Sequence, residues 1–566
     1  MGYDPARFPW PSRRYPVYAP RGMVSTSQNL ATRAGLAMLE KGGNAVDAAI
    51  AAAACLTVVE PTSNGLGSDA FAIVYAGGAF HGLNGSGPAP LAADPMALRA
   101  RGLDAVPALG WPAVTVPGAV GAWAELARRF GALPWKDLFA PAIEYASEGF
   151  AVSPVVARGW SRAYARYASS DLGDLARPWM AAFAPLGRAP RAGEIVRLPD
   201  HARTLEAIAE GGAEILYRGE LAARIDRFSR ETGGWLRAAD LAAYSPLEAP
   251  PVAARYRGHE VLELPPNGQG LVALLALAIL ERLRSDGRSS ADGSAAPDVG
   301  RRAARGAGGG AEGGNELRAT HAAIEAIKLA FREGRLRIAD PASSAHCAEE
   351  LLDSNNVSRL AAEIGSEASR PAEARPDRGG TVYLATASGG TGPRDLVMVS
   401  FIQSNYMGFG SGLVVPGTGI ALQNRGACFS LDPAHPNALA PGKRSYHTII
   451  PGFLARDGEP LGPFGVMGGF MQPQGHVQVL ERLLGQGVNP QAALDAPRWE
   501  WVSGARVLAE QACPTELLRG LEGLGHKVEV SLEDGEFGRG QIILRTAEGS
   551  FCAGCEPRAD SLAAGI

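Results

Sequence analysis

Cysteine is scarce in this sequence, and its positions do not suggest a disulfide framework. Only six of the 566 residues are cysteine, and most of them lie far apart along the chain. Scattered single cysteines are typical of free thiols in a reducing compartment. Cys552 and Cys555 have the spacing of a redox motif, but no strand–helix–strand pattern surrounds them, so we interpret them as two unpaired thiols.

Long hydrophobic runs and blocks of one charge are also missing. A membrane-spanning helix needs about 20 consecutive apolar residues, and no stretch of this sequence has them. Residues 1–18 contain several prolines and arginines where a signal peptide would have an apolar core. The formal net charge is −4, and no long basic block occurs. We therefore expect a cytoplasmic protein that binds neither nucleic acid nor membranes.

Common catalytic and cofactor motifs are absent as well. The sequence has no P-loop, no His-Glu-x-x-His and no Gly-x-Ser-x-Gly placed between a strand and a helix. Gly408, Gly410 and Gly412 resemble part of a dinucleotide-binding fingerprint, but no helical pattern follows them. The cysteines and histidines lack a convincing zinc-ligand spacing. We expect neither a metal nor an organic cofactor.

The chain does contain enough apolar residues for a large core. They are arranged in two textures, that is, two kinds of hydrophobic spacing. Hydrophobic residues make up 46% of the sequence, which suffices for an extensive buried interior. Before Thr381 the spacing predicts helices at 30–41, 45–58, 118–130, 136–149 and 271–283. After Thr381 it predicts strands at 382–387, 396–402, 419–422 and 447–454. This order is compatible with sheets packed between helix layers.

One internal segment differs from both textures. Residues 285–316 are rich in Gly, Ala, Ser, Arg and Asp and contain almost no large apolar residue. Such a segment cannot bury enough surface to order itself. We interpret 285–316 as a flexible surface insertion, after which helical spacing resumes at Leu317 and continues to about Arg337.

The tripeptide Gly379-Gly380-Thr381 stands where the texture changes, and it suits self-cleavage. Thr381 begins an apolar run, and the glycine before it leaves the scissile carbonyl unhindered. The Thr381 hydroxyl can attack the Gly380 carbonyl, and water can then hydrolyse the resulting ester. The released α-amine would serve as the base for the Thr381 hydroxyl. A turn followed by an ordinary strand is the alternative interpretation.

A second Gly-rich segment, Gly465 to Gly469, follows an apolar strand pattern. Adjacent backbone N–H groups in such a turn can point at one oxygen, which is how oxyanion holes are built. A tight turn without a catalytic role is the alternative. His447 and His476 are candidates for polar roles, although a single histidine near an apolar strand is more often a structural hydrogen-bonding group.

These segments together resemble the γ-glutamyltransferase family of N-terminal-nucleophile hydrolases. The matching segments run through nearly the whole chain and are residues 42–49, 59–67, 116–118, 264–266, 380–381, 409–412, 443–444 and 468–469. The resemblance implies an α+β fold, a four-layer αββα sandwich. It also implies a precursor that is cut before Thr381 into a large portion, 1–380, and a small portion, 381–566. The two portions would stay together as one intertwined domain.

The resemblance also assigns roles to individual residues. It makes Thr381 the nucleophile and the N–H groups of Gly468 and Gly469 the oxyanion donors. The family's second hydroxyl, which helps to orient the nucleophile, falls near Ser404, with Ser400 as the alternative. The positions that the resemblance assigns to the substrate are Asn405, Arg425, His447 and Thr448.

Three departures from the family pattern concern the γ-glutamyl group. The family binds its α-carboxylate through an Arg-Glu-x-Ala-Pro motif, and this chain has Ser86 to Pro90 instead. The acids that bind its α-amine are missing from Gln423 to Ser430, where Arg425 stands, and the paired serines are replaced by His447 and Thr448. An ammonium group facing Arg425 would be repelled. We therefore expect an anion in this pocket, unless Arg425 faces solvent or pairs with a structural acid.

Segments 445–451 and 471–476 resemble a bacterial branch of the family that includes oxamate amidohydrolase. We therefore predict a self-processing amidohydrolase for a small amide bearing a carboxylate, with water as the acceptor. The alternatives are a γ-glutamyltransferase or glutathione hydrolase, a dicarboxylic acyl (cephalosporin-type) acylase, and an unprocessed, non-catalytic binding protein. The partners expected are the amide substrate and the two portions of the precursor, and the sequence leaves a homo-oligomer open.

Overall fold

Two antiparallel sheets face each other at the centre of the protein. The computed structural model describes residues 14–287, 309–344, 346–371, 380–389 and 395–566. In the first sheet the strand order is β19 (Leu562–Gly565), β2 (Gly22–Thr26), β10 (Gly380–Ser388), β11 (Val397–Tyr406), β3 (Asp69–Ala76), β4 (Ala79–Asn84), β7 (Leu247–Glu248). In the second it is β1 (Val17–Ala19), β18 (Phe551–Cys555), β17 (Arg539–Arg545), β13 (Glu459–Met467), β12 (Gly452–Arg456), β9 (His259–Glu263), β8 (Val252–Tyr256).

The space between the sheets is filled by large, mostly apolar side chains. Phe71 and Tyr383 from the first sheet are buried there with Phe453 and Ile543 from the second. Gly465 lies so close beneath the Tyr383 ring that an added Cβ would come within 2.5 Å of it. The two strands that carry these residues, β10 and β13, therefore run tightly against each other, and their ends lead to Thr381 and Gly468 respectively.

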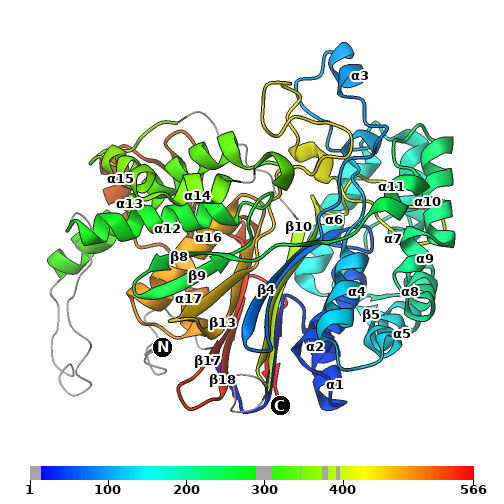
Figure 1. Ribbon diagram of the computed structural model, residues 1–566, viewed down its shortest axis with the longest axis horizontal. Helices are drawn as coiled ribbons and strands as arrows, with labels where there is room; N and C mark the ends of the chain where they lie inside the picture. Colours follow the sequence, from blue (N-terminus) through cyan, green and yellow to red (C-terminus); the bar gives the residue numbers. More distant parts are fainter. Residues whose placement is uncertain (1–13, 288–308, 345, 372–379, 390–394) are drawn as a thin grey trace.

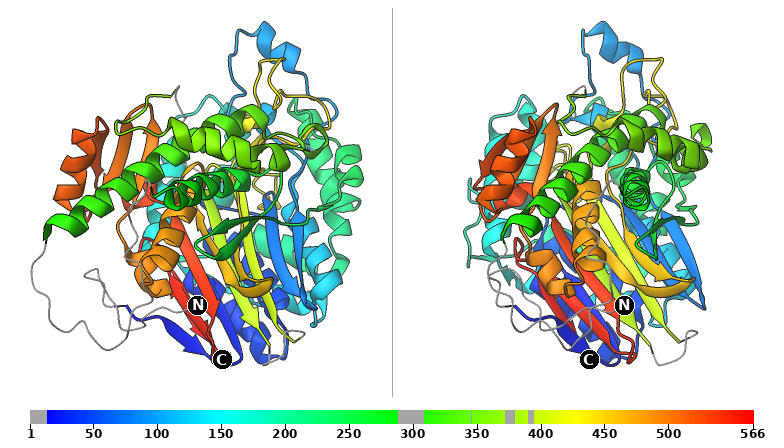
Figure 2. Two further views of the ribbon diagram at one scale, coloured as in Figure 1. Left: turned by 60° about the vertical axis from the view of Figure 1, so that its left-hand side comes forward. Right: turned by 90° about the vertical axis from the view of Figure 1, so that its left-hand side faces the viewer.

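Helices cover the outer face of each sheet. The first sheet packs against α1 (Asn29–Glu40) and the alanine-rich α2 (Ala45–Val59), in which all residues are buried. The second sheet packs against α12 (Gly270–Ser285) and α16 (Met471–Leu480), with α13 (Gly309–Arg337) outside α12. Figures 1 and 2 show the two helical layers on opposite sides of the sheets. The predicted α+β class and αββα sandwich are confirmed.

Both sheets combine strands that precede Gly380 with strands that begin at or follow it. In the first sheet β10 lies between β2 and β11, so a strand that follows Gly380 pairs with one that begins the chain. In the second sheet β12 lies between β9 and β13. Each half therefore completes the sheets of the other, and neither half holds a full core alone.

The ends of α2 follow from local sequence. Asn44 accepts hydrogen bonds from the N–H groups of Val46 and Asp47, and the Asp47 side chain accepts from the Asn44 N–H, which is a reciprocal capping box. Gly42, with φ of 88°, ends the preceding helix in a conformation that side chains disfavour. Both features were readable in the sequence, which explains why α1 and α2 were predicted within two residues.

Other predicted elements were wrong or displaced. Residues 419–422 and 447–451 are not strands, and 252–263 forms the β8–β9 hairpin, for which no strand was predicted. The predicted helix 136–149 is a 3₁₀ turn followed by α5 (Ala140–Glu148). Short apolar runs do not distinguish a strand from a packed loop, because periodicity needs length to be informative.

The boundaries of the expected insertion also need correction. Residues of its two ends are helical, since α12 continues through Ser285 and α13 begins at Gly309. Residues 288–308 lie outside the described part of the chain. Three further strands were not predicted as a sheet, namely β14 (Trp499–Ser503), β15 (Arg506–Glu510) and β16 (Lys527–Ser531). No described helix is both long and apolar enough to cross a bilayer.

Candidate active site

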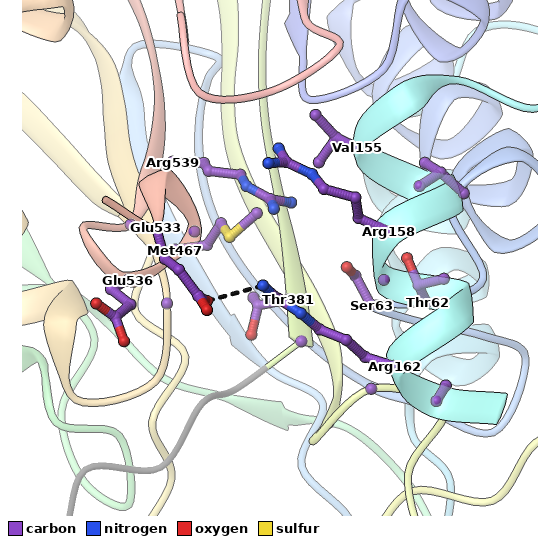
Figure 3. A pocket seen from close by; sticks show the side chains of 18 of the residues that line it. Thr62, Ser63, Val155, Arg158, Arg162, Thr381, Met467, Glu533, Glu536 and Arg539 are labelled. Atoms are coloured by element: carbon purple, nitrogen blue, oxygen red, sulfur yellow. Dashed lines mark hydrogen bonds and ion pairs between the residues drawn. The ribbon is translucent and has the colours of Figure 1, made fainter. Parts of the chain in front are cut away.

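Thr381 lies at an irregularity near the start of β10. Gly380 pairs with Tyr406 and Val382 pairs with Gln403, so the register of the ladder shifts at Thr381. A bulge of this kind re-aims a side chain out of the regular alternation. A Cβ added to Gly380 would come within 2.8 Å of the Gly408 nitrogen, so glycine is required by close approach. Thr381 is buried, but it lines a cavity of about 630 Å³ (Figure 3).

Ser404 connects the Thr381 hydroxyl to the carbonyl of Gly380. Thr381 Oγ1 donates to Ser404 Oγ at 3.0 Å, and Ser404 Oγ donates to the Gly380 carbonyl oxygen at 2.7 Å. The Tyr406 N–H also donates to Ser404 Oγ, at 2.8 Å. The single proton of Ser404 is thereby directed at the Gly380 carbonyl, while its lone pairs face the Thr381 hydroxyl and the Tyr406 amide.

The hydroxyl of Ser400 hydrogen-bonds to Tyr383 and not to Thr381. Its Oγ lies 2.8 Å from the phenol oxygen of Tyr383, inside the core between the sheets. The sequence could not separate the two serines, because they are four residues apart on one strand and share a face. The strand register places Ser404, and not Ser400, beside Thr381.

Arg425 is fully buried behind Ser404. Its guanidinium donates to Thr448 Oγ1 at 2.8 Å and to Ser404 Oγ at 3.5 Å, and its Cζ lies 4.4 Å from the centroid of the Tyr406 ring. Tyr406 has φ of 76°, an uncommon conformation for a residue with a side chain. Arg425 does not line the cavity at Thr381, so the expected solvent-facing alternative does not apply.

A buried acid, Asp69, shares this polar region, and the sequence analysis missed it. Burial raises the pKa of Asp69 to about 7, although the charge of Arg425 opposes the shift. The Nε2–H of His447 donates to Asp69 Oδ2 at 3.0 Å, and His447 Nδ1 accepts from the Ile449 N–H at 3.3 Å. Burial, followed by the charge of Arg425, holds the pKa of His447 well below its usual value. His447 is therefore neutral at pH 7.

Asn405 has one occupied and one free polar group. Its Oδ1 accepts from Ser68 Oγ at 2.9 Å. Its buried Nδ2 has no hydrogen-bond partner within the described ranges. A buried amide N–H without a partner is uncommon in folded proteins. Asn405, His447 and Thr448 all lie behind Thr381 rather than on the cavity wall, so their assignment to the substrate stays a prediction.

Gly468 and Gly469 lie directly after β13, and Gly468 lies on the same cavity as the start of β10. Gly468 has φ of 142° and Gly469 has φ of 61°, conformations that strongly favour glycine. Gly468 lines the cavity together with Thr381. The Gly469 carbonyl accepts from Gln269 Nε2 at 2.8 Å, and the same nitrogen donates to the Thr448 carbonyl at 2.7 Å. Gln269 thus holds the glycine turn against the Arg425 region.

Several arginines that the sequence analysis did not identify also line the cavity. Arg158, Arg162 and Arg166 come from α6 (Pro154–Ala168), and Arg539 comes from the first position of β17. Arg162 forms an ion pair with Glu533 at 2.7 Å, which is drawn in Figure 3. The four-residue spacing on α6 places the three arginines on one face of the helix, and this spacing is visible in the sequence.

A metal site is disfavoured by the side chains present. Across the described ranges, one group of three potential ligands has its ligand atoms within 4.8 Å, and it consists of His321, Glu325 and His526. The Lys328 ammonium donates to Glu325 Oε1 at 2.7 Å and thus already neutralises the carboxylate. None of the three residues lines the cavity at Thr381.

Comparisons with known proteins agree with this geometry. The family model for gamma-glutamyltranspeptidase matches residues 31–566. The glutathione hydrolase-like YwrD proenzyme of Bacillus subtilis is 35% identical over 97% of this chain and 99% of its own length. The oxamate amidohydrolase proenzyme of Klebsiella pneumoniae is 34% identical over 96% of this chain and 98% of its own length.

Solved structures give the same result. The crystal structure of cephalosporin acylase from Bacillus halodurans has a TM-score of 0.88 at 50% identity, covering 100% of this chain and 99% of that one. These relatives are enzymes and span the chain from end to end, which confirms the predicted enzyme class. The chain therefore belongs to the γ-glutamyltranspeptidase family of N-terminal-nucleophile hydrolases.

Proposed function

We propose that the chain cuts itself between Gly380 and Thr381 and then hydrolyses small amides with Thr381 as the nucleophile. The observation that carries this proposal is the hydrogen-bonded series from the Thr381 hydroxyl through Ser404 to the Gly380 carbonyl. The products of maturation would be residues 1–380 and 381–566, which remain associated because strands of both build each sheet.

Maturation begins with an attack of Thr381 Oγ1 on the carbonyl carbon of Gly380. The hydroxyl proton moves to the departing amide nitrogen, and the peptide bond becomes an ester. Ser404 donates a hydrogen bond to the carbonyl oxygen that gains negative charge during this step. Water then hydrolyses the ester, which leaves a carboxylate on Gly380 and a free α-amine on Thr381.

Substrate turnover repeats the same chemistry with an external amide. The free α-amine takes the proton of the Thr381 hydroxyl as it attacks the substrate carbonyl. The N–H groups of Gly468 and Gly469 stabilise the oxyanion, because the positive φ values of both glycines form a turn beside the cavity. The α-ammonium group returns this proton to the leaving amine, and water then attacks the acyl-enzyme to release the acid and restore Thr381.

We infer that the preferred substrates are monoamides of dicarboxylic acids. The groups that bind a γ-glutamyl amine are absent from the sequence, and the cation of Arg425 lies within hydrogen-bonding distance of Ser404. A cation in this position disfavours an ammonium group and favours a carboxylate. Oxamate is the smallest such amide, and the relative from K. pneumoniae supports it.

A second candidate function is the hydrolysis of longer dicarboxylic acyl amides. The cavity of about 630 Å³ is larger than oxamate needs, and arginines line it. The structural relative from B. halodurans, which is named a cephalosporin acylase, supports this candidate. The glutathione hydrolase-like relative from B. subtilis supports a third substrate type, the γ-glutamyl amides.

The experiment that tests the proposal combines fragment masses with a substrate panel. Purified protein should give two fragments on a denaturing gel, the smaller beginning at Thr381 by mass spectrometry. The cleaved enzyme should hydrolyse oxamate or glutaryl-p-nitroanilide faster than γ-glutamyl-p-nitroanilide. An intact single chain without activity would instead support the non-catalytic alternative, and a preference for the γ-glutamyl anilide would contradict the substrate class.

A further inference from the structure

The wall of the cavity opposite the Ser404–Arg425 region carries an excess of arginine. Arg158, Arg162 and Arg166 repeat every four residues along α6, so their side chains leave the helix on one face. All three line the same cavity as Thr381. The arrangement places a row of guanidinium groups on the same cavity as the nucleophile, where they can contact a substrate.

These arginines differ in whether they already have an anionic partner. Arg162 pairs with Glu533 at 2.7 Å, and Arg506, across the cavity, pairs with Glu529 at 2.8 Å. Arg158 has no carboxylate within ion-pair distance among the residues that the structure describes. Its guanidinium nevertheless points over the cavity, as Figure 3 shows.

Arg539 faces the same space from the other side. Figure 3 shows its guanidinium directed toward that of Arg158, above Thr381 and beside Met467. It forms an ion pair with Glu60 at 3.6 Å, and Glu60 also accepts from Ser27 at 2.6 Å and Ser63 at 3.2 Å. Burial raises the pKa of Glu60, although the charge of Arg539 opposes the shift. Two guanidinium groups therefore converge on one space, although the cavity is also lined by Glu60, Glu500, Glu533 and Glu536.

We propose that Arg158 and Arg539 form a carboxylate subsite for the distal end of the substrate's acyl chain. A guanidinium presents a planar pair of donors that matches a carboxylate, and two of them converging from α6 and β17 can bind both of its oxygens. The ligands are amides of dicarboxylic acids in which a methylene chain separates the scissile carbonyl from the second carboxylate. This subsite rests on the proposed function of Thr381, and it refines that function.

Arg158 and Arg425 would then bind the carboxylates of different substrates. Arg425 is buried behind Ser404 and is engaged by Thr448, so it can reach only a carboxylate next to the scissile carbonyl. Arg158 and Arg539 lie on the cavity wall, so they can reach a carboxylate at the end of a longer chain. The subsite thus selects substrates longer than oxamate.

The test compares glutaryl-p-nitroanilide with valeryl-p-nitroanilide, which has a methyl group in place of the carboxylate. Wild-type enzyme should prefer the glutaryl compound by about 10-fold or more in kcat/KM. Arg158→Gln and Arg539→Gln should each lower kcat/KM for the glutaryl compound by about 10- to 100-fold, because a charge-assisted hydrogen bond is lost. Both variants should leave the valeryl compound within about threefold of wild type.

Two further variants separate the subsite from general effects. Arg128→Gln removes an exposed charge that does not line the cavity and should change the glutaryl preference by less than about threefold. Arg539→Lys retains the charge without the planar fork and should fall between wild type and Arg539→Gln. Fragment patterns on a denaturing gel show whether each variant still folds and cleaves itself.

A binding measurement tests the subsite independently of catalytic turnover. Glutarate should bind wild-type protein more tightly than Arg158→Gln by isothermal titration calorimetry, by about 10-fold or more. Equal losses on the glutaryl and valeryl compounds, or equal glutarate affinity, would overturn the subsite and leave the Thr381 chemistry standing. The proposed function itself is contradicted if cleaved wild-type enzyme hydrolyses neither anilide nor oxamate, regardless of its affinity for glutarate.

Discussion

The two walls that flank Thr381 are built on opposite principles. The wall behind it is fully buried, and there Arg425 is hydrogen-bonded to Ser404 and Thr448. The wall in front of it is the lining of the cavity, where Arg158 and Arg539 converge from two sides and Arg158 has no acidic partner among the described residues. One wall is fixed by its own hydrogen bonds, while the other leaves its charge available to a ligand.

The difference teaches how the family fold separates chemistry from selection. A buried polar group that loses its partner costs roughly 1–3 kcal/mol, so the rear wall tolerates little change. Charges that face solvent are screened and contribute little to folding. Changes behind Thr381 should therefore affect cleavage and the turnover of every substrate, whereas changes in front of it should affect only which substrate is used.

The largest effect is expected at Thr381 itself. Thr381→Ala should remain a single chain and should have no measurable amidase activity, because alanine has no hydroxyl to attack Gly380. Thr381→Ser, which retains a hydroxyl, should still cleave. Denaturing gels and intact mass spectrometry measure both outcomes. Cleavage of the alanine variant at the Gly380–Thr381 bond would show that another group performs the cut.

Ser404 and Ser400 provide a matched pair on one strand. Ser404→Ala removes the donor to the Gly380 carbonyl and should slow self-cleavage and turnover by about 100-fold. Ser400→Ala disturbs only the contact with Tyr383, so it should cleave at nearly the wild-type rate. The rates are followed by gel densitometry after expression at low temperature. If both variants behave alike, the hydrogen bonds of Ser404 are not part of the chemistry.

A smaller and more selective effect is expected at Arg425. Arg425→Lys keeps the charge but loses the fork that reaches Thr448 and Ser404 together. Oxamate hydrolysis should fall by about 10-fold or more, whereas hydrolysis of valeryl-p-nitroanilide should fall less. Steady-state kinetics on the cleaved enzyme give both values. Equal losses on the two substrates would assign Arg425 to the positioning of Ser404 rather than to a carboxylate.

The smallest effect concerns the pH dependence of stability. Folding raises the pKa of Asp69 from 3.8 to about 7. Between pH 3.8 and about 7, Asp69 keeps its proton in the folded state but has lost it in the unfolded chain. Asp69 therefore makes the free energy of unfolding fall as pH rises. His447 acts in the opposite sense below pH 6.5, because its folded pKa is lowered. Asp69→Asn removes the first contribution and leaves the second.

The measurement is the melting temperature of cleaved protein between pH 5 and 8. The stability of Asp69→Asn relative to wild type should increase with pH up to about 7 and then level off. The control Ser400→Ala removes no group that titrates in this range, so it should differ from wild type by a constant amount. A flat difference for Asp69→Asn would mean that Asp69 is charged throughout.

The sequence predicted well where local rules decide structure. The capping residue Asn44, the terminating Gly42 and the glycine before Thr381 all act within a few residues of the structures they fix. The loop 419–422 was predicted as a strand, because an apolar run of four residues does not reveal whether it pairs. Local chemistry therefore pointed to the bond proposed for cleavage but did not describe its surroundings.

The sequence by itself determined the family and the sandwich, and it supplied the proposal of cleavage at the Gly380–Thr381 bond, because each depends on the order of residue types along the chain. Only the tertiary structure decided that Ser404 rather than Ser400 meets Thr381, since both have the same strand periodicity and the register selects between them. It also decided that Arg158 and Arg539 face one space. These two residues lie far apart in sequence, and no local rule relates them until α6 and β17 pack around the same cavity.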